Sequence, residues 1–287
     1  MDMSVVDLTS ACDLHTHSCY SDGTYTPEEL VAQAKRIGLK AIALTDHNNV
    51  DGLLRFTAAA KIEGIEAVSG VEFSVDYFGS ELHLLMLGVK PEDYVKIRQI
   101  LLDYQQKKEQ SNRDLIEKLN HIGLEVSYDD LCNRTASGFV NRAVIAAELM
   151  DKGYVSSVKE GFRKYLSEKN GLFVPPKRMD ALEMICFIKS LGGIAVLAHP
   201  FLNLDEDGLR KFLPEAMNAG LDAIETIYSE FDAKTTEVAQ RIAEEFGVLQ
   251  SGGSDFHGKA KPEIALGIGR GNLFVPYSFW ERLQRSL

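Results

Sequence analysis

Short apolar runs alternate with amphipathic stretches over most of this chain. The runs have the length and the Ala, Val, Ile and Leu content of buried strands, whereas the stretches between them repeat apolar residues at helical spacing. The expected strands span 41–45, 67–75, 82–89, 194–198, 223–228 and 248–251. The expected helices span 27–37, 50–63, 181–191, 209–218 and 234–246. This alternation predicts an α/β fold in which parallel strands close into a barrel or form a sheet.

The first expected helix carries start and stop signals. Thr26 is the expected N-cap, Pro27 suits the first helical position, and Glu29 would close a capping box. Gly38 is expected to end the helix. These residues predict a helix from Pro27 to about residue 37.

Residues 91–167 interrupt the alternation. A long charged stretch at 94–122 repeats apolar residues near helical spacing and is expected to form one helix. Two or three shorter helices are expected around 130, at 143–150 and at 158–166. We interpret 91–167 as an all-helical insertion that covers the mouth of the active site, within a barrel domain formed by 1–90 and 168–287.

Length and charge limit the classes of function. The 287 residues are enough for one large domain with an insertion and a substantial core. The formal net charge of -11 argues against binding to long nucleic acid, which usually needs a basic face. No apolar run approaches the roughly 18–20 residues of a membrane span. Because the start also lacks the features of a signal peptide, we expect a cytoplasmic protein with no membrane partner.

Histidines lie near the expected strand ends. His15 and His17 are two residues apart on a strand that follows an apolar run with Val5 and Val6, so both side chains would point to one face. Six of the seven histidines lie in segments that resemble a strand end followed by a turn, namely His15, His17, His47, His83, His199 and His257. Core packing explains such positions poorly, and they indicate a metal site. His121, on a polar helix end, is interpreted as a surface residue.

Carboxylates accompany these histidines. In a βα barrel the carboxyl ends of the strands meet at one face, where Asp22, Glu72 and Asp255 would join the imidazoles. Glu72 stands in an apolar run, where an unpaired carboxylate would be costly to bury, so a ligand role is favoured. Asp255 precedes His257 by two residues and repeats the spacing of the first motif. Asp22 and Asp46 are equally consistent with turn residues.

The order of these motifs resembles the PHP (polymerase and histidinol phosphatase) family of metal-dependent phosphoesterases, and within it the stand-alone bacterial members with a helical insertion. The resemblance rests on Asp13-Leu14-His15-Thr16-His17-Ser18, Thr45-Asp46-His47, Gly70-Val71-Glu72, Ala198-His199-Pro200 and Gly253-Ser254-Asp255-Phe256-His257. It extends over nearly the whole chain. It implies a distorted, TIM-like (β/α)7 barrel with a small all-helical insertion.

The resemblance also implies a trinuclear metal site. The first metal would be held by His15, His17, Glu72 and Asp255. The second would be held by Glu72 as a bridge, His83 and His199. The third would be held by Asp22, His47 and His257. Imidazoles and carboxylates without a thiolate suit two to three ions of Mn, Fe or Zn better than Mg or Ca.

The expected chemistry is attack by a hydroxide that bridges two metals. Paired metals lower the pKa of a shared water and hold the attacked phosphoryl oxygens. Glu72 and Asp255 would shape this bridge and guide its proton. His257 joins them as a catalytic candidate through the third metal, which would neutralise the phosphate and the leaving oxygen.

Three residues are candidates for substrate binding. Arg142, in the insertion, offers a planar fork for a phosphate. Lys177 is a weaker candidate, with a solvated surface position as the alternative interpretation. Tyr228 either hydrogen-bonds the substrate or packs in the core.

Two positions depart from the family pattern and leave the exact substrate open. Val144 stands where related members often have His, and Glu230-Phe231 stands where many have a basic residue or His.

The predicted function is hydrolysis of a phosphate ester on a small metabolite or nucleotide. Two substrates remain open: the 3′-phosphate of a nucleoside 3′,5′-bisphosphate, and short RNA or DNA oligonucleotides trimmed from the 5′ end. The acidic composition slightly favours the small substrate. C–N hydrolysis of the amidohydrolase type is disfavoured, because those sites commonly use a carboxylated Lys where this chain has Glu72. A non-catalytic metal-binding domain is disfavoured because no expected ligand is missing.

Overall fold

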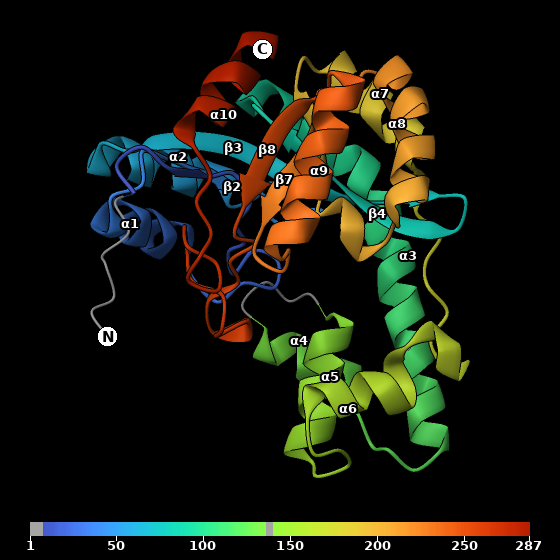
Figure 1. The fold of residues 1–287 in the computed structure, drawn as a ribbon. Helices are drawn as coiled ribbons and strands as arrows, with labels where there is room; N and C mark the ends of the chain where they lie inside the picture. The colour runs from blue at the N-terminus through green and yellow to red at the C-terminus, as the bar shows by residue number, and fades with distance from the viewer. Residues whose placement is uncertain (1–7, 136–139) are drawn as a thin grey trace. The chain divides into compact units, whose positions relative to one another are not determined.

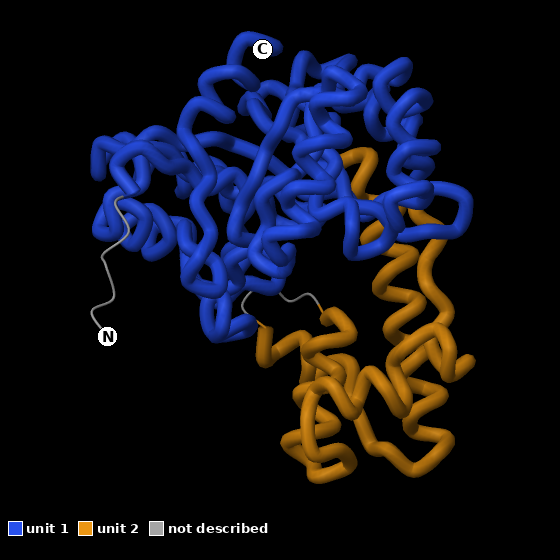
Figure 2. Tube along the Cα trace, viewed as in Figure 1, with its two compact units in different colours: residues 1–98, 179–287 blue, residues 99–178 orange. Residues whose placement is uncertain are grey.

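The computed structural model describes residues 8–135 and 140–287 and divides the chain into two compact units. Unit 1 comprises 1–98 and 179–287, and unit 2 comprises 99–178 (Figure 2). All the described strands belong to unit 1, whereas the described part of unit 2 contains helices and no strand. Val5 and Val6, expected before the first strand, lie outside the described residues.

Unit 1 is a nearly closed barrel built on one mixed sheet (Figure 1). Its strands are β1 (Cys12–Asp13), β2 (Ala41–Leu44), β3 (Glu66–Tyr77), β4 (Ser80–Leu87), β5 (Met179–Asp180), β6 (Ile194–Ala198), β7 (Ala223–Tyr228) and β8 (Leu249–Gly253). The strand order is β1-β2-β3-β4-β6-β7-β8, and β5 pairs with β3. Hydrogen bonds from Leu14 N–H to the Gly252 carbonyl and from Asp255 N–H to the His15 carbonyl join the two ends of the sheet. The predicted barrel is confirmed.

Helices of unit 1 pack on the outside of these strands (Figure 1). They are α1 (Pro27–Ile37), α2 (Leu53–Glu63), α7 (Ala181–Ser190), α8 (Glu206–Ala219) and α9 (Ala233–Phe246). The helix α10 (Tyr277–Leu283) instead contributes side chains to the apolar core inside the barrel. Short 3-10 turns occur at Pro91–Asp93, Pro200–Leu202, Gly258–Ala260 and Gln284–Ser286. The helix α3 (Tyr94–His121) begins in unit 1 and continues in unit 2.

The ends of α1 are those predicted. The Thr26 side chain accepts the Glu29 N–H, and the Glu29 carboxylate accepts the Thr26 N–H, which completes the capping box. Gly38 ends the helix with φ of 88°, a left-handed conformation that glycine adopts without a Cβ clash.

One strand runs against the others, which corrects the expectation of a parallel barrel. β4 is antiparallel to both β3 and β6, because the two-residue turn Phe78-Gly79, with φ of 49° and 85°, makes β3 and β4 a hairpin. The reversal places the start of β4 beside the carboxyl end of β6, so that His83 pairs with Ala198. The prediction that His83 lies at a strand end was therefore wrong.

The first strand is shorter than expected. β1 covers only Cys12–Asp13, but the chain beyond it stays between its neighbours. Thr16 forms an isolated parallel bridge with Phe256 and accepts the Thr45 N–H on its other side. His15 and His17 therefore lie just beyond the regular strand, held between the ends of β2 and β8.

The inward faces of the strands carry apolar residues at one end and the predicted ligands at the other. Alternation places Glu72 on the same face of β3 as Val68, and His83 on the same face of β4 as Leu85. The buried apolar cluster comprises Cys12, Leu14, Ala41, Ala43, Val68, Leu85, Leu87, Ile194, Val196, Ala198, Ala223, Leu273, Val275, Trp280 and Leu283. Its last two members come from α10, a helix that the hydrophobic pattern did not predict.

Unit 2 has its own apolar core. Besides the larger part of α3 it contains α4 (Tyr128–Arg134), α5 (Arg142–Asp151), α6 (Val158–Gly161), a π-helical turn at Phe162–Leu166 and a 3-10 turn at Glu168–Asn170. Buried residues from these segments, such as Leu119, Leu131, Leu149 and Leu166, pack together. The predicted helices are present, whereas the expectation that this insertion covers the site stays a prediction.

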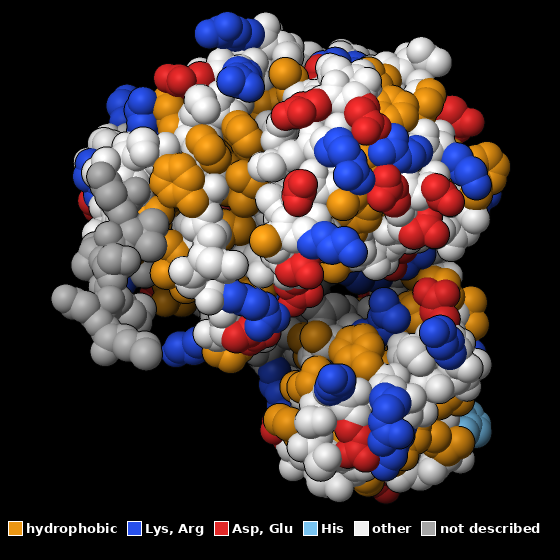
Figure 3. Space-filling view, viewed as in Figure 1, with side chains coloured by type: hydrophobic (Ala, Val, Ile, Leu, Met, Phe, Trp, Pro, Cys, Tyr) orange, Lys and Arg blue, Asp and Glu red, His pale blue; other side chains and the backbone are white. Residues whose placement is uncertain are grey.

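The surface of unit 1 mixes both signs of charge. On the face drawn in Figure 3, Lys and Arg side chains are interspersed with Asp and Glu over this unit. Among the described helices, none combines the length and the apolar composition needed to cross a bilayer.

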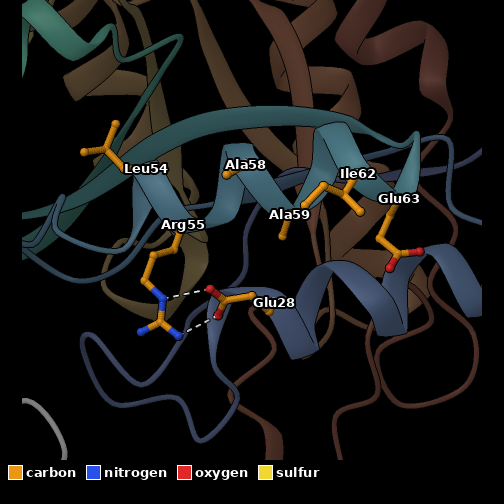
Figure 4. Close-up of a pocket in the computed structure, with 7 residues that line it drawn as sticks. All are labelled: Glu28, Leu54, Arg55, Ala58, Ala59, Ile62 and Glu63. Atoms are coloured by element: carbon orange, nitrogen blue, oxygen red, sulfur yellow. Dashed lines mark hydrogen bonds and ion pairs between the residues drawn. The ribbon is translucent and has the colours of Figure 1, made fainter.

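A groove of about 420 Å³ lies between α1 and α2 (Figure 4). Arg55 spans it by donating from Nε and Nη2 to the two carboxylate oxygens of Glu28, at 2.7 and 2.9 Å. Exposed Leu54 and Ile62 form its apolar part. None of the predicted ligands lines this groove, so it is not the predicted site.

Glu66, at the start of β3, fastens α10 to the barrel. Its carboxylate accepts hydrogen bonds from the Tyr277 hydroxyl at 2.6 Å, Trp280 Nε1 at 2.7 Å and Gln284 Nε2 at 2.6 Å. Glu66→Ala leaves three donors without a charged acceptor and should lower the free energy of unfolding by about 2–4 kcal/mol. Urea unfolding followed by the fluorescence of Trp280, the single tryptophan, measures this change.

Glu63→Ala, at the exposed end of α2, is the control and should change stability by less than about 0.5 kcal/mol. Equal effects of the two substitutions would contradict this role of Glu66.

Candidate metal centre

All nine predicted ligands lie in unit 1, on segments that meet at one end of the barrel. Six of them follow a strand: His15 and His17 follow β1, His47 follows β2, His199 follows β6, and Asp255 and His257 follow β8. Two lie within strands, Glu72 on β3 and His83 on β4. Asp22 lies in a turn. Their donor atoms form four overlapping groups, each within 4.8 Å: His17, Asp22, His47 and His257; His15, Glu72 and His199; His15, His17 and Asp255; His47, Glu72 and His83. Such overlap is consistent with a multinuclear metal site.

Glu72 belongs to two of these groups, and five imidazoles lie close to its carboxylate. Its Oε1 lies 2.7 Å from His83 Nδ1 and 3.2 Å from His199 Nε2. Its Oε2 lies 3.3 Å from His15 Nε2 and 3.2 Å from His17 Nε2. The same oxygen is 2.8 Å from His47 Nδ1. Each carboxylate oxygen therefore faces a different set of imidazoles, which is the arrangement of a carboxylate that bridges two cations.

The two carboxylate oxygens of Asp255 also have different partners. Oδ1 lies 3.1 Å from His17 Nε2 and 3.6 Å from His15 Nε2. Oδ2 accepts hydrogen bonds from the Tyr228 hydroxyl at 2.9 Å and from Lys261 Nζ at 2.8 Å. Two donors thus hold Oδ2, while Oδ1 remains directed to the imidazoles.

Asp22 lies beside a second group of imidazoles. Its Oδ1 is 3.2 Å from His257 Nε2 and 3.9 Å from His17 Nδ1, and its Oδ2 is 3.9 Å from His47 Nε2. The alternative of a simple turn residue does not account for these neighbours. Asp22, His47 and His257 therefore offer donors for a cation separate from those beside Glu72.

Unpaired atoms test whether this donor set suits metal ions. Glu72 Oε2 and Asp22 Oδ1 are buried and accept no hydrogen bond, although imidazole nitrogens lie 2.8–3.3 Å from the first and 3.2 Å from the second. His15 Nε2 and His17 Nε2 are likewise only 3.1 Å apart. Buried donors that lie this close together, two of them without a hydrogen-bond partner, fit a cation.

The electrostatics of the buried groups agree with this fit. Burial raises the pKa of Glu72, but the imidazoles of His47, His15 and His83 outweigh it and hold the pKa well below its usual range. Burial lowers the pKa of His47 to about 4, even though Glu72 opposes the shift. Burial also lowers the pKa of His17, but the nearby carboxylates of Asp255 and Glu72 outweigh it and raise the pKa to about 9. The buried carboxylates require positive charge, which protons or metal ions can supply.

Sequence reasoning missed a second set of carboxylates that orient the ligands. Glu225 on β7 lies with Oε1 3.0 Å from His15 Nδ1, and its Oε2 accepts the His199 N–H at 2.7 Å. Hydrogen bonding of the far ring nitrogen fixes the orientation of a ligating histidine. A carboxylate within the apolar run Ala223–Tyr228 was the available signal, and it is the signal that singled out Glu72.

Two aspartates perform a similar task for the backbone. Asp46 accepts hydrogen bonds from Ser18 N–H at 2.7 Å and from the Ser21 hydroxyl at 2.6 Å. Asp13 accepts the Ser254 N–H at 2.8 Å and thereby ties the first ligand segment to the last. Asp46 is thus more than the turn residue that was its alternative interpretation.

Backbone strain is concentrated at this end of the barrel. Of the four non-glycine residues with positive φ among the described residues, His199 (29°) and Asp255 (55°) are predicted ligands, and Asn48 (47°) follows another. Such conformations cost about 1–3 kcal/mol each and persist where the surroundings enforce them. The strain is consistent with a functional site.

The predicted substrate-binding residues lie in different places. Tyr228 is buried, and its hydroxyl donates to Asp255, which indicates that it orients this ligand. Arg142, in unit 2, lies over the Phe173 ring at 4.1 Å and donates from Nη1 to the Leu166 carbonyl at 3.3 Å. Lys177 is exposed in the same unit. Contact of these three residues with substrate stays a prediction.

The comparisons with known proteins agree with this geometry. The family model described as PHP domain matches residues 13–171. A 5′-3′ exoribonuclease from Haemophilus influenzae is 33% identical over 251 residues, which cover 87% of this chain and 91% of the relative. A 3′,5′-nucleoside bisphosphate phosphatase from Chromobacterium violaceum is 28% identical over 249 residues, which cover 85% and 86%. The crystal structure of a metal-dependent phosphoesterase from Bifidobacterium adolescentis has a TM-score of 0.84 and 26% identity, with 96% of both chains covered.

The family match covers more than half of the chain, and the similarity to the Haemophilus influenzae protein extends over most of it. The converging donors around Glu72 supply the chemical reason for these matches. The chain therefore belongs to the PHP domain family and is a metal-dependent phosphoesterase of the stand-alone bacterial type.

Proposed function

We propose that this phosphoesterase hydrolyses the ester at the 3′ oxygen of a 5′-terminal nucleotide, with a nucleoside 3′,5′-bisphosphate or a short oligonucleotide as substrate. The phosphoester chemistry is carried by Glu72, whose two oxygens face different imidazoles. The nucleotide class is supported by the relatives, described as an exoribonuclease and a nucleoside bisphosphate phosphatase. Both activities can be explained by cleavage of one bond, between phosphorus and the 3′ oxygen of the first nucleoside.

The proposed ligand sets are those that the family resemblance implies, and the distances are compatible with them. His15, His17 and Asp255 would hold one ion with Glu72 Oε2, and His83 and His199 would hold a second with Oε1. Asp22, His47 and His257 would hold a third. When bound, Mn, Fe or Zn would lower the pKa of a water and polarise the phosphoryl oxygens.

The residues of the chain contribute positioning. Glu225 fixes the His15 ring, and Tyr228 and Lys261 fix Asp255. Because these donors are already ordered, little reorganisation is needed when charge develops on the phosphoryl group. The water oxygen would form the new bond to phosphorus while the bond to the 3′ oxygen breaks, and the 3′ oxygen would leave with a proton.

Two alternatives from other classes are less well supported. A C–N hydrolase of the amidohydrolase type would be expected to bridge its metals with a carboxylated Lys, whereas Glu72 lies at the centre here. A non-catalytic metal domain would be expected to lack ligands, but the nine donors are all present.

A substrate series tests the proposed function. The manganese-, iron- or zinc-loaded protein is assayed with a nucleoside 3′,5′-bisphosphate, with 5′-phosphorylated RNAs of two to twenty nucleotides, and with p-nitrophenyl phosphate. We expect release of nucleoside 5′-monophosphate from the nucleotide substrates, with rates that do not rise with RNA length, because the net charge of -11 disfavours long nucleic acid. Hydrolysis of p-nitrophenyl phosphate alone would reject the nucleotide proposal and leave the phosphoesterase class intact.

Metal removal and substitution should give a graded loss of activity. Chelation should abolish turnover and lower the melting temperature, and added metal should restore both. Glu72→Gln removes the shared charge and should reduce both metal content and activity to near background. Glu225→Gln leaves all nine donors in place but removes the charge beside His15 and the His199 N–H, and it should cost about 10- to 100-fold in activity or metal affinity. Elemental analysis, activity assays and circular dichroism are the measurements.

If Glu72→Gln fails to fold, as measured by circular dichroism, Glu72 has mainly a structural role. Full activity in Glu72→Gln would show that another residue bridges the metals. A Glu225→Gln protein as impaired as Glu72→Gln would place Glu225 among the direct ligands.

Arg142 carries the prediction about selectivity. If it binds a non-scissile phosphate, Arg142→Ala should lower kcat/KM for nucleotide substrates by about 10- to 150-fold, because one charge-assisted hydrogen bond is lost. Hydrolysis of p-nitrophenyl phosphate, which lacks that second phosphate, should change little. The contact with Phe173 gives Arg142 an alternative role in the core of unit 2, so the melting temperature is measured in parallel. Equal loss on both substrates with a lowered melting temperature would support the structural role.

A further inference from the structure

Lys261 is a cation beside the metal centre that the ligand set does not use. It follows the 3-10 turn Gly258–Ala260 after the last ligand segment. Its Nζ lies 2.8 Å from Asp255 Oδ2, the oxygen that faces away from His15 and His17. The Tyr228 hydroxyl already donates to the same oxygen at 2.9 Å. Asp255 therefore has a neutral donor in Tyr228 that can hold it, and the ammonium adds charge as well as a second hydrogen bond.

The ammonium has donor capacity left. A lysine ammonium carries three N–H groups. Within residues 8–135 and 140–287, Asp255 is the only hydrogen-bond or ion-pair partner of the Lys261 ammonium. The side chain is 37% exposed, whereas the Asp255 side chain is 5% exposed, so Lys261 extends from the buried ligands to a position that solvent reaches. Two N–H groups therefore remain for a ligand from solution.

The loop that carries Lys261 is held in place. The Lys259 N–H donates to the Thr24 hydroxyl at 2.8 Å, and the Lys261 N–H donates to the Gly258 carbonyl at 3.3 Å. Thr24 lies two residues after Asp22, so the backbone near Lys261 is fixed to a second ligand segment. An ammonium on a fixed loop beside a metal site is positioned before a substrate arrives.

We propose that Lys261 binds the phosphoryl group that is being hydrolysed, keeping one N–H on Asp255 Oδ2 and donating another to a phosphoryl oxygen. The flexible stem of lysine suits a group whose oxygens move during the reaction. This inference rests on the phosphoester chemistry of the site and is independent of the nucleotide proposed as leaving group.

The alternative is that Lys261, like Tyr228, only positions Asp255. If Lys261 only positions Asp255, its loss should lower the metal content of the protein. If it binds phosphate, its loss should weaken phosphate binding while the metal content stays constant. Lys261→Met removes the charge and keeps the length of the side chain, and Lys261→Arg keeps the charge. Lys259→Met removes an exposed lysine of the same loop and is the matched control. Tyr228→Phe removes the other donor to Asp255 Oδ2. Its effect on metal content and activity shows what the loss of a residue that only positions Asp255 looks like.

The test uses metal-loaded full-length protein and inorganic phosphate as the probe. Calorimetry gives the dissociation constant of phosphate, elemental analysis gives the metal content, and kcat/KM is measured with p-nitrophenyl phosphate. Lys261→Met should weaken phosphate binding and lower kcat/KM by about 10- to 100-fold, the effect of one charge-assisted hydrogen bond, with unchanged metal content. Lys261→Arg should recover most of the loss, and Lys259→Met should stay within about twofold of the parent protein.

Unchanged phosphate affinity in Lys261→Met would overturn the proposal. So would an equal loss in Lys259→Met, which would indicate a general effect of loop charge. A loss of metal in Lys261→Met that matches Tyr228→Phe would assign Lys261 to positioning instead. If the parent protein binds phosphate and hydrolyses p-nitrophenyl phosphate but no nucleotide, the proposed function fails while the Lys261 comparison still gives an answer.

Discussion

A fully buried carboxylate at the centre of the barrel is the constraint on which this structure depends. Glu72 is inaccessible to solvent, and an isolated charge in that position would cost several kcal/mol. Five imidazoles offset this cost, and they reach Glu72 from four other segments of the barrel. The side chains that would bind metals therefore also stabilise the mouth of the barrel, and the fold and the chemistry of the site cannot be separated there.

Around these ligands lies a layer of hydrogen bonds that determines how they point. Glu225 acts on an imidazole, whereas Asp13 and Asp46 act mainly on the backbone that carries the ligands. This layer explains how His199 and Asp255 are kept at positive φ, a conformation that an isolated peptide would leave. Rigid ligand placement of this kind is what a site needs to hold several like-charged ions close together.

Features with a local cause were predictable from the sequence. The ends of α1 follow from Thr26, Glu29 and Gly38. A carboxylate within an apolar strand is enough to make Glu72 a ligand candidate from its sequence neighbours alone. The same argument would have found Glu225 had it been applied to β7.

Features with a cause distant in sequence were not predictable. The direction of β4 depends on a two-residue turn whose left-handed Phe78 has no clear sequence signal. The helix α10 is held by Glu66, more than 200 residues earlier in the chain. Lys261 resembles any surface lysine in the sequence, and only the fold places it against Asp255. The division of the nine donors among three ions stays a prediction, because it depends on where the ions lie between the side chains.

The hairpin formed by β3 and β4 has a consequence for how the protein is made. It brings His83 to within 2.7 Å of Glu72, which is only 11 residues earlier, so this pair can form without any long loop closure. His15, His17, Asp22 and His47 also precede the insertion, whereas His199, Asp255 and His257 follow it. During synthesis on the ribosome, six of the nine donors thus emerge before the insertion and three after it. A partly made chain can capture a metal ion early, and the last strand then completes its coordination as it closes the barrel.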